Sequence, residues 1–289
     1  MNRQAVATKL VRWSVVTAVV AFLAGPALIV AVASFNEGRY LDFPVEDYSL
    51  RWYANLLTDP LWRDATTSSL VVAGSSAGLA VVIALPLAYS LHTYRPRFAR
   101  VLLGFGLLPF MLPPVISAIS MLVFWGELGR PGRIDNVIVA HAVFFSSVPL
   151  LTITLALRSI DPAAGQAAAT LGATPATVFR TITLPLLRPG IATGFVITLV
   201  LSLNEYIISF VVAQAAFETL PIRVFNSLRY GFTPTVAAMA VVFTLISVAV
   251  LAGLARFTGL ANLTGPDRTD VTDPTDREDR ADREAQPAV

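Results

Sequence analysis

The chain has 289 residues, of which 55% are hydrophobic and 14% charged, and its formal net charge is +2. A mean hydropathy of +0.67 is too high for a soluble domain of ordinary composition, so the chain is predicted to be an integral membrane protein. Cysteine is absent, and the single lysine, Lys9, lies in no glycine-rich context, so thiolate chemistry and a GxxxxGK[ST] phosphate-binding loop are both excluded.

Six apolar runs are long enough to cross a bilayer as helices, because hydrocarbon about 30 Å thick requires roughly 20 helical residues. The predicted fold is therefore an all-α membrane protein with one transmembrane domain over residues 14–257. Six spans place both chain ends on the same side of the membrane. The predicted spans are 14–34, 68–91, 101–125, 136–157, 190–212 and 235–257.

The N-terminal segment, residues 1–13, carries Arg3, Lys9 and Arg12 ahead of the first span. A basic start also precedes a signal peptide, but the apolar run that follows is longer than the roughly 7 to 15 residues typical of that class. We therefore expect an uncleaved anchor. The alternative is cleavage that leaves Ser34 as the mature N-terminus.

Arginines indicate the orientation of the spans, because loops on the cytosolic side carry an excess of basic residues. The triplet Arg95, Arg97 and Arg100 lies between the second and third spans and predicts that this loop is cytosolic. The two chain ends and the loop 161–189 then lie in the cytosol as well. In the tail, 258–289, acids alternate with arginines, which predicts a disordered segment, with a regulatory or docking role as the alternative to no specific task.

Two external segments are predicted to rest against the membrane surface or the bundle. Segment 36–65 mixes charges with tyrosine and tryptophan, which is typical of chain at the headgroup level; an ordinary folded loop is the alternative. In 220–230, Pro221 suits a helix start and apolar residues recur every three positions, which predicts a short helix against the bundle.

The third span contains Pro109, Pro113 and Pro114, which must kink or interrupt its helix because proline lacks an N–H and clashes with the preceding turn. Half-helix ends inside a bundle can present backbone dipoles to a solute. Pro113 and Pro114 are therefore candidates for a gate or pathway element, with a packing kink as the alternative. His92 and His141 are far apart in the sequence, so neither a metal site nor a cofactor is predicted.

The loop between the fourth and fifth spans is predicted to form two short helices joined by a glycine turn. Pro162 suits a first helical turn, and Gly172 suits the left-handed position that ends a helix. Thr174 and Pro175 provide an N-cap and a first turn for a second helix, which is expected to end before Pro185. Small side chains on one face of the first helix let another surface approach its backbone closely. This face consists of Ala163, Ala164, Ala167, Ala168 and Leu171.

The fifth span carries Glu205, the one acidic side chain well inside a predicted span. Polar residues recur around it at helical spacing, so a continuous helix would gather them on one face. Because a polar face against lipid is unfavourable, this face is predicted to line the bundle interior or a water-filled translocation path. The alternative is a buried glutamate bonded to a neighbouring helix for packing. His141 and Tyr206 are interpreted as ordinary bundle residues. The candidate path residues are Thr198, Ser202, Asn204, Glu205 and Ser209.

The loop also carries a pattern at fixed spacing: an EAA-like triplet, three residues, a glycine, nine residues and then I-x-L-P. This pattern resembles the cytosolic loop of binding-protein-dependent ABC transporter permeases. The resemblance implies a coupling helix that docks on an ATPase subunit and transmits its nucleotide-driven closure to the spans. The chain departs from the family at the first position, where Gln166 replaces the usual glutamate and lacks its charge. The coupling residues are Gln166, Ala167, Ala168, Gly172, Ile182, Leu184 and Pro185.

Further segments resemble the spermidine/putrescine group of these permeases, among them ASFNEGRYLDFP at 33–44, LPPVISAIS at 112–120 and SLNEYIISF at 202–210. The resemblance implies a non-catalytic permease subunit in a bacterial inner membrane that encloses half of a translocation path for a polyamine. The implied partners are a second permease chain, two separate ATPase subunits, an extracytoplasmic solute-binding protein and the lipid bilayer, and no nucleic acid. In that group, acidic residues tend to occupy both positions held here by Asn204 and Glu205.

Two alternatives to polyamine import are open. Related permeases carry amino-acid-like solutes, opines, anions or iron, so the solute could be one of these. A secondary carrier that works without ATP is the alternative from another class. Such a carrier would need ion-coupling carboxylates in several spans, and only Glu205 is available.

Overall fold

The computed structural model describes residues 3–39, 44–94, 96–230 and 233–257. Within these ranges the chain is helical, and the β-type pairing is limited to an isolated bridge between Asn36 and Tyr48. The predicted all-α class is therefore confirmed. The predicted C-terminal tail, 258–289, lies outside the described residues.

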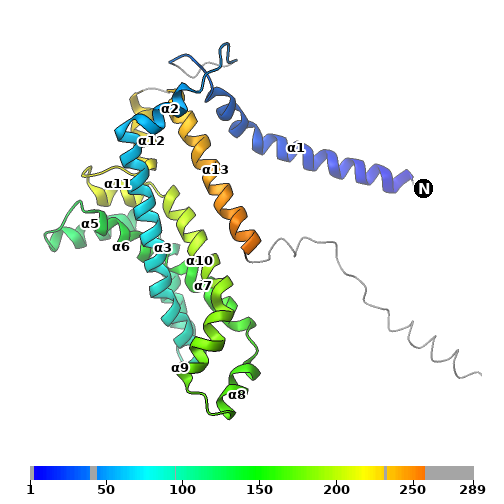
Figure 1. The fold of residues 1–289 in the computed structure, drawn as a ribbon, viewed down its shortest axis with the longest axis vertical. Coiled ribbons are helices and arrows are strands. Elements are labelled where there is room, and N and C mark those ends of the chain that lie inside the picture. Colours follow the sequence, from blue (N-terminus) through cyan, green and yellow to red (C-terminus); the bar gives the residue numbers. More distant parts are fainter. Residues whose placement is uncertain (1–2, 40–43, 95, 231–232, 258–289) are drawn as a thin grey trace, which may run out of the picture.

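The described part of the chain consists of α-helices and one π-helical segment, η1 (Figure 1). These elements are α1 (Arg3–Ala33), α2 (Arg51–Thr58), α3 (Pro60–Tyr94), α4 (Ala99–Met111), α5 (Pro114–Glu127), α6 (Ile134–Phe145), α7 (Ser147–Ser159), α8 (Pro162–Thr170), α9 (Pro175–Val178), η1 (Phe179–Thr183), α10 (Leu184–Asn204), α11 (Ile207–Ala213), α12 (Leu220–Tyr230) and α13 (Pro234–Phe257).

Four helical stretches in the described chain are long and apolar enough to cross a membrane: most of α1, α3, the stretch Pro175–Asn204, and α13. Two further candidates are bent pairs. Helices α4 and α5 meet at 95° and α6 and α7 at 42°, so the number of spans is six if each pair counts as one. The sharper bend lies at Leu112 and Pro113, and Pro114 begins α5. The interruption predicted from these prolines is confirmed.

The helix that begins at Pro175 does not end before Pro185, so that prediction is wrong. Helix α9, η1 and α10 follow one another without a gap and form one continuous helical stretch up to Asn204. The π-helical turn immediately before Pro185 changes the hydrogen-bond register, so the missing proline N–H does not interrupt a regular α-helical ladder. The loop is therefore joined to the following span by a continuous helix.

The two ends of the bundle carry different elements (Figure 1). Helices α8 and α9 form one tip, whereas α2 and α12 lie at the opposite end. Both α2 and α12 pack against α3 and α13, around the buried side chains of Trp52, Trp62 and Leu220. The short helix predicted over 220–230 is confirmed. Trp52 is buried and its Nε1 donates a hydrogen bond to the Asn36 carbonyl at 2.7 Å, which favours a folded loop over a segment lying at headgroup level.

Helices α3, α7 and α10 pack closely against one another and form the middle of the bundle. On α10, a Cβ added at Gly194 would lie 2.7 Å from Pro149 Cα, and one added at Gly190 would lie 2.6 Å from Ala156 Cβ. Small residues allow such close approach between helix backbones in membranes. Helix α3 also carries a row of small buried side chains, namely Ala73, Ala77, Ala80, Ala84 and Ala88.

Gly194→Ala is expected to destabilise the bundle by about 1–3 kcal/mol, because the added methyl group would overlap the Pro149 backbone. Gly253→Ala is the matched control, since Gly253 is also helical but has open space around its Cβ position. The control is expected to be neutral or slightly stabilising because alanine favours helix. Thermal unfolding of both purified variants in detergent measures the difference, and equal melting temperatures would contradict this packing.

Candidate functional site

The loop between α7 and α10 forms the predicted pair of short helices at one tip of the molecule (Figure 1). Asp161 Oδ1 accepts a hydrogen bond from Ala163 N at 2.9 Å and caps α8. Gly172 follows α8 with a φ of +84°, a left-handed conformation that glycine adopts without strain. Thr174 Oγ1 accepts a hydrogen bond from Thr177 N at 3.3 Å and caps the next helix. The Thr174 cap and the glycine turn predicted for this loop are confirmed, and the Asp161 cap is an addition that the structure shows.

The outer face of α8 is a shallow surface of small side chains. Ala167 is exposed on it, and Leu171 projects beside it with 88% of its surface exposed. Gln166 is also exposed, but it lines the cavity between α8, the end of α3 and η1. The other side of α8 rests on α9 and η1, where Gly165 faces Val178. Within the described chain, the outer face of α8 is therefore not covered and is open to contact with another protein surface.

The last three residues of the loop pattern are less exposed than Gln166, Ala167 and Gly172. Ile182, Leu184 and Pro185 are half-buried at the junction of η1 and α10. Nearby, the Tyr89 ring of α3 meets the Phe179 ring of η1 edge to face, with ring centroids 4.7 Å apart. The pattern thus combines the exposed helix α8 with an anchored base, the residues Ile182, Leu184 and Pro185, which joins the loop to α3 and α10.

The predicted fifth span, 190–212, is not one helix. Helix α10 ends at Asn204, Glu205 has an extended backbone, and α11 begins two residues later. Glu205 stabilises the break because its Oε1 accepts a hydrogen bond from Ile208 N at 2.8 Å and its Oε2 accepts one from Ser209 N at 3.0 Å. The predicted continuous polar face is therefore wrong: a carboxylate that binds the free N–H groups of a new helix competes with bonds inside a continuous one.

The polar residues nevertheless converge on His141 of α6. Its Nδ1 lies 2.7 Å from Ser202 Oγ, and its Nε2 lies 3.0 Å from Ser209 Oγ and 3.2 Å from Glu205 Oε2. The His141 side chain is fully buried and the Glu205 side chain is 8% exposed. If Nε2–H donates to Glu205, Nδ1 accepts a hydrogen bond from Ser202. We call these four residues the His141 cluster.

His141 is the residue of this site whose part sequence analysis missed, since it was interpreted as an ordinary bundle residue. It is buried in the bundle as expected, but it joins α6 to both halves of the broken helix. An ionisable residue inside a predicted span is a signal of a functional site with a polar partner. Glu205, as the one acid in the predicted spans, was the partner to consider.

Two of the candidate path residues do not join the His141 cluster. Thr198 is buried on α10, and its Oγ1 has no hydrogen-bond partner among the described residues. Asn204 is exposed, and its Nδ2 donates to the Val200 carbonyl at 2.8 Å. It lines a cavity of about 240 Å³ between α10, α12 and α13. Asn204 and Glu205 therefore point into different surroundings despite being adjacent in sequence.

The helices that follow two of the breaks, at Pro113 and at Glu205, pack against each other. Helix α5, which follows Pro113 and Pro114, contacts α11, and both contact α6. Ala118, Ile208 and Val212 are buried in one hydrophobic cluster at this contact. Because close-packed interiors transmit displacement, a shift at the proline break is expected to move α11 as well.

Comparison with known proteins is consistent with this geometry. A family described as a binding-protein-dependent transport system inner membrane component matches residues 56–258. The chain is 30% identical over 243 residues to the spermidine/putrescine transport system permease protein PotC of Escherichia coli, an alignment that covers 84% of this chain and 92% of that protein. It is 33% identical over 264 residues to the molybdenum transport system permease protein ModB of Mycobacterium bovis, covering 86% of this chain and 94% of that protein.

The fold is also similar to solved structures. A bacterial ABC transporter involved in import of the acidic polysaccharide alginate contains a chain that matches with a TM-score of 0.65 at 17% identity, covering 89% of this chain and 98% of that chain. The alginate transporter has also been solved in complex with a periplasmic protein that holds an alginate pentasaccharide, with a TM-score of 0.63. These likenesses show the same fold.

Proposed function

The chain belongs to the family of binding-protein-dependent transport system inner membrane components and is a non-catalytic permease component of an ABC importer, and we propose that the solute it imports is a polyamine.

The exposed outer face of α8 is the observation that carries the proposed coupling mechanism. In this proposal α8 docks on a separate ATPase subunit through Gln166, Ala167, Ala168 and Gly172. Because Gln166 is uncharged, it forms no salt bridge with the ATPase. The main contact is then the close approach of the ATPase surface to the α8 backbone. Movement of α8 then reaches α10 through the anchored base, because α9, η1 and α10 are one continuous helical stretch. The residues of this base are Ile182, Leu184 and Pro185.

The position of α8 also sets the proposed orientation. The tip that carries α8 faces the cytosol together with both chain ends, so α2 and α12 face the exterior, where a solute-binding protein docks. Residues 14–257 act as one permease domain and pair with a second permease chain, and two ATPase subunits hold the two coupling loops. The outward projection of α1 from the bundle leaves its apolar side chains exposed for lipid and for that second chain (Figure 1).

The proposed translocation path passes the break before α5 and the break before α11. Glu205 is bound within the bundle, so it acts on a solute through its negative charge and by holding the break between α10 and α11. Ser202 and Ser209 keep His141 in place beside it, with Thr198 one turn away on α10. Asn204 supplies the exposed polar side chain at the break. The interruption at Pro113 and Pro114 acts as a gate because α5 packs on α11.

The charge at this break favours a cation over an anion as the solute. Glu205 is the acid placed there, and a carboxylate in a medium of low dielectric constant attracts a cation strongly. PotC is named as a spermidine/putrescine permease, whereas ModB is named for molybdenum, so the relatives include more than one kind of transport system.

Uptake into proteoliposomes tests this function. The chain, purified with its ATPase, second permease chain and solute-binding protein, is expected to take up labelled spermidine or putrescine only when ATP is supplied to the ATPase. Molybdate in the same assay measures the anion alternative. Flux that persists without ATP under a proton gradient would indicate a secondary carrier, and uptake of molybdate but not polyamine would contradict the proposed solute.

A further inference from the structure

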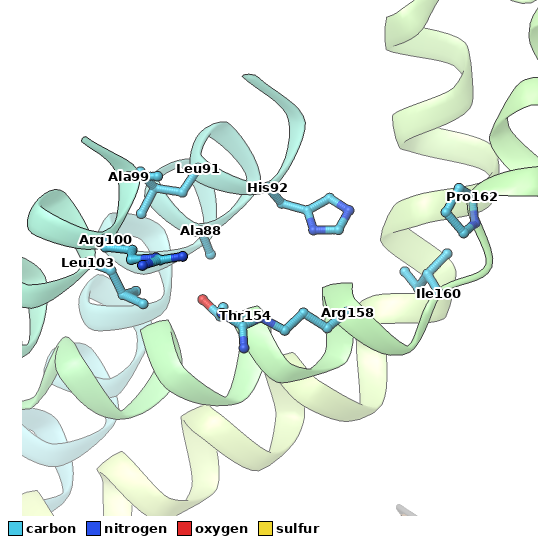
Figure 2. A pocket seen from close by; sticks show the side chains of 10 residues that line it. All are labelled: Ala88, Leu91, His92, Ala99, Arg100, Leu103, Thr154, Arg158, Ile160 and Pro162. Carbon is cyan, nitrogen blue, oxygen red and sulfur yellow. The ribbon is translucent and has the colours of Figure 1, made fainter. Parts of the chain in front are cut away.

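A basic cavity of about 350 Å³ lies near the coupling loop, between the end of α3, the start of α4 and the end of α7 (Figure 2). Arg100 comes from the first turn of α4 and Arg158 from the last turn of α7, and His92 lines the same cavity from the end of α3. Figure 2 shows that Arg100 reaches into the space from one side, with Thr154 and Arg158 below it. The function proposed above gives no role to this cavity.

The cavity has the charge and the hydrogen-bonding groups of an anion site. Among the described residues, neither Arg100 nor Arg158 forms an ion pair. Asp161 lines the adjoining cavity, but its Oδ1 caps α8. The Thr154 hydroxyl in the wall is buried and has no hydrogen-bond partner in the described part of the chain. Two guanidinium groups and a free hydroxyl match the oxygen atoms of a phosphate.

The surroundings of the cavity favour a lipid over a soluble anion. The helices that line the cavity also carry exposed apolar side chains, namely Val101 and Phe105 of α4 and Leu155 of α7, and the exposed Phe98 directly precedes α4. Such a surface suits contact with acyl chains, while the basic residues sit at the end of the bundle where a headgroup would lie. Basic pockets between transmembrane helices on the cytosolic side are known to bind lipid headgroups.

We propose that this cavity binds the phosphate of an anionic phospholipid, through Arg100, Arg158 and the Thr154 hydroxyl. The lipid would belong to the cytosolic leaflet, an assignment that rests on the orientation proposed above. Ile160 and Pro162 also line the cavity and lead directly into α8. A bound headgroup therefore lies against the start of the coupling helix and holds it in position relative to α4.

Lipid retention tests the proposal without depending on transport. The full transporter complex is placed in nanodiscs of phosphatidylcholine and phosphatidylglycerol, and the retained lipids are measured by native mass spectrometry. Wild type is expected to retain phosphatidylglycerol selectively. Arg100→Gln and Arg158→Gln are each expected to weaken this selectivity about fivefold, and the double variant by roughly 25-fold, since losing one hydrogen bond to the headgroup weakens binding by about that factor.

Three control measurements distinguish lipid binding in this cavity from a general effect of charge, from misfolding and from binding of free phosphate. Arg97→Gln/Arg256→Gln removes two charges from exposed positions outside the cavity and is expected to retain the preference. Arg100→Lys/Arg158→Lys keeps both charges and is expected to retain most of it, which separates loss of charge from misfolding. Excess inorganic phosphate is expected not to displace the lipid.

The proposal is overturned if wild type shows no preference, if both double glutamine variants lose it equally, or if inorganic phosphate displaces the lipid fully and so identifies a free-anion site. None of these outcomes bears on ATP-driven uptake, which is measured separately. Failure of the lipid proposal therefore leaves the proposed import function untouched.

Discussion

Gly172→Glu is expected to reduce ATP-driven uptake by roughly 100-fold while the chain remains in the membrane, since a coupling free energy of this kind has that upper range. Gly172 has a φ of +84°, so a side chain there is strained by about 1–2 kcal/mol. The space around its Cβ position is open, so the new carboxylate meets no atom of this chain and instead enters the surface proposed to dock on the ATPase. Uptake and ATP hydrolysis, measured on the same proteoliposomes, are expected to become uncoupled.

Two controls separate strain from loss of docking. Gly129→Glu is the same substitution at another left-handed glycine with open space around it, φ +66°, in the loop between α5 and α6. It is expected to retain uptake. Gly172→Asn, which tolerates the left-handed conformation and adds no charge, is expected to retain most of it. Equal losses in Gly172→Glu and Gly129→Glu would show that α8 has no special part in coupling.

The local structure of the coupling loop could be predicted because its signals are short-range. Proline at a first turn, threonine at an N-cap and glycine at a C-cap each act through atoms within four residues, and all three lie where expected. The end of the second helix could not be predicted in this way. Pro185 breaks a regular α-helix, but η1 changes the register before it, and the contact between Phe179 and Tyr89 of α3 is visible only in the fold.

Glu205→Leu is expected to destabilise the folded chain by about 2–4 kcal/mol, the combined cost of leaving a buried hydrogen-bonding group without its partner and of losing a helix cap. The change leaves His141 buried without its carboxylate and removes both acceptors that cap α11. Asn204→Leu is the matched control, because Asn204 is exposed and bonds only within α10. Thermal unfolding in detergent measures both variants, and a Glu205→Leu variant as stable as Asn204→Leu would contradict the role given to the His141 cluster.

A double-mutant cycle tests whether His141 and Glu205 act together. His141→Leu/Glu205→Leu removes both polar groups, so it is expected to destabilise less than the sum of the two single changes. Such a result would show that the two residues stabilise the fold mainly through their interaction with each other. Additive losses would show that Glu205 acts mainly by capping α11, with His141 as an independent packing residue.

Helical spacing predicted which residues of the fifth span belong together but not how they meet. Ser202, Glu205 and Ser209 do share one environment, as their spacing indicated. They meet around His141, a residue some 60 positions earlier in the sequence, and across a break that Glu205 itself stabilises. A long-range partner of this kind leaves no periodic pattern, so the break after Asn204 could not be read from the span alone.

The contact between α5 and α11 likewise could not be predicted from the sequence. Proline predicted the break before α5, and nothing near Asn204 predicted the break before α11. Their packing through Ala118 and Ile208 joins the proposed gate to the His141 cluster. In the proposed mechanism, this contact lets a shift at the proline break reach Glu205.

Crosslinking from the tip of α8 tests the central claim most directly, and the absence of native cysteine makes it clean. Leu171→Cys places one thiol at a side chain that is 88% exposed, and Leu57→Cys places one on exposed α2 at the opposite end. A bifunctional thiol reagent is expected to join Leu171→Cys, but not Leu57→Cys, to the ATPase subunit, in a yield that changes with ATP. The account is contradicted if Leu171→Cys never captures the ATPase, or if a membrane-impermeant thiol reagent labels it from outside intact cells.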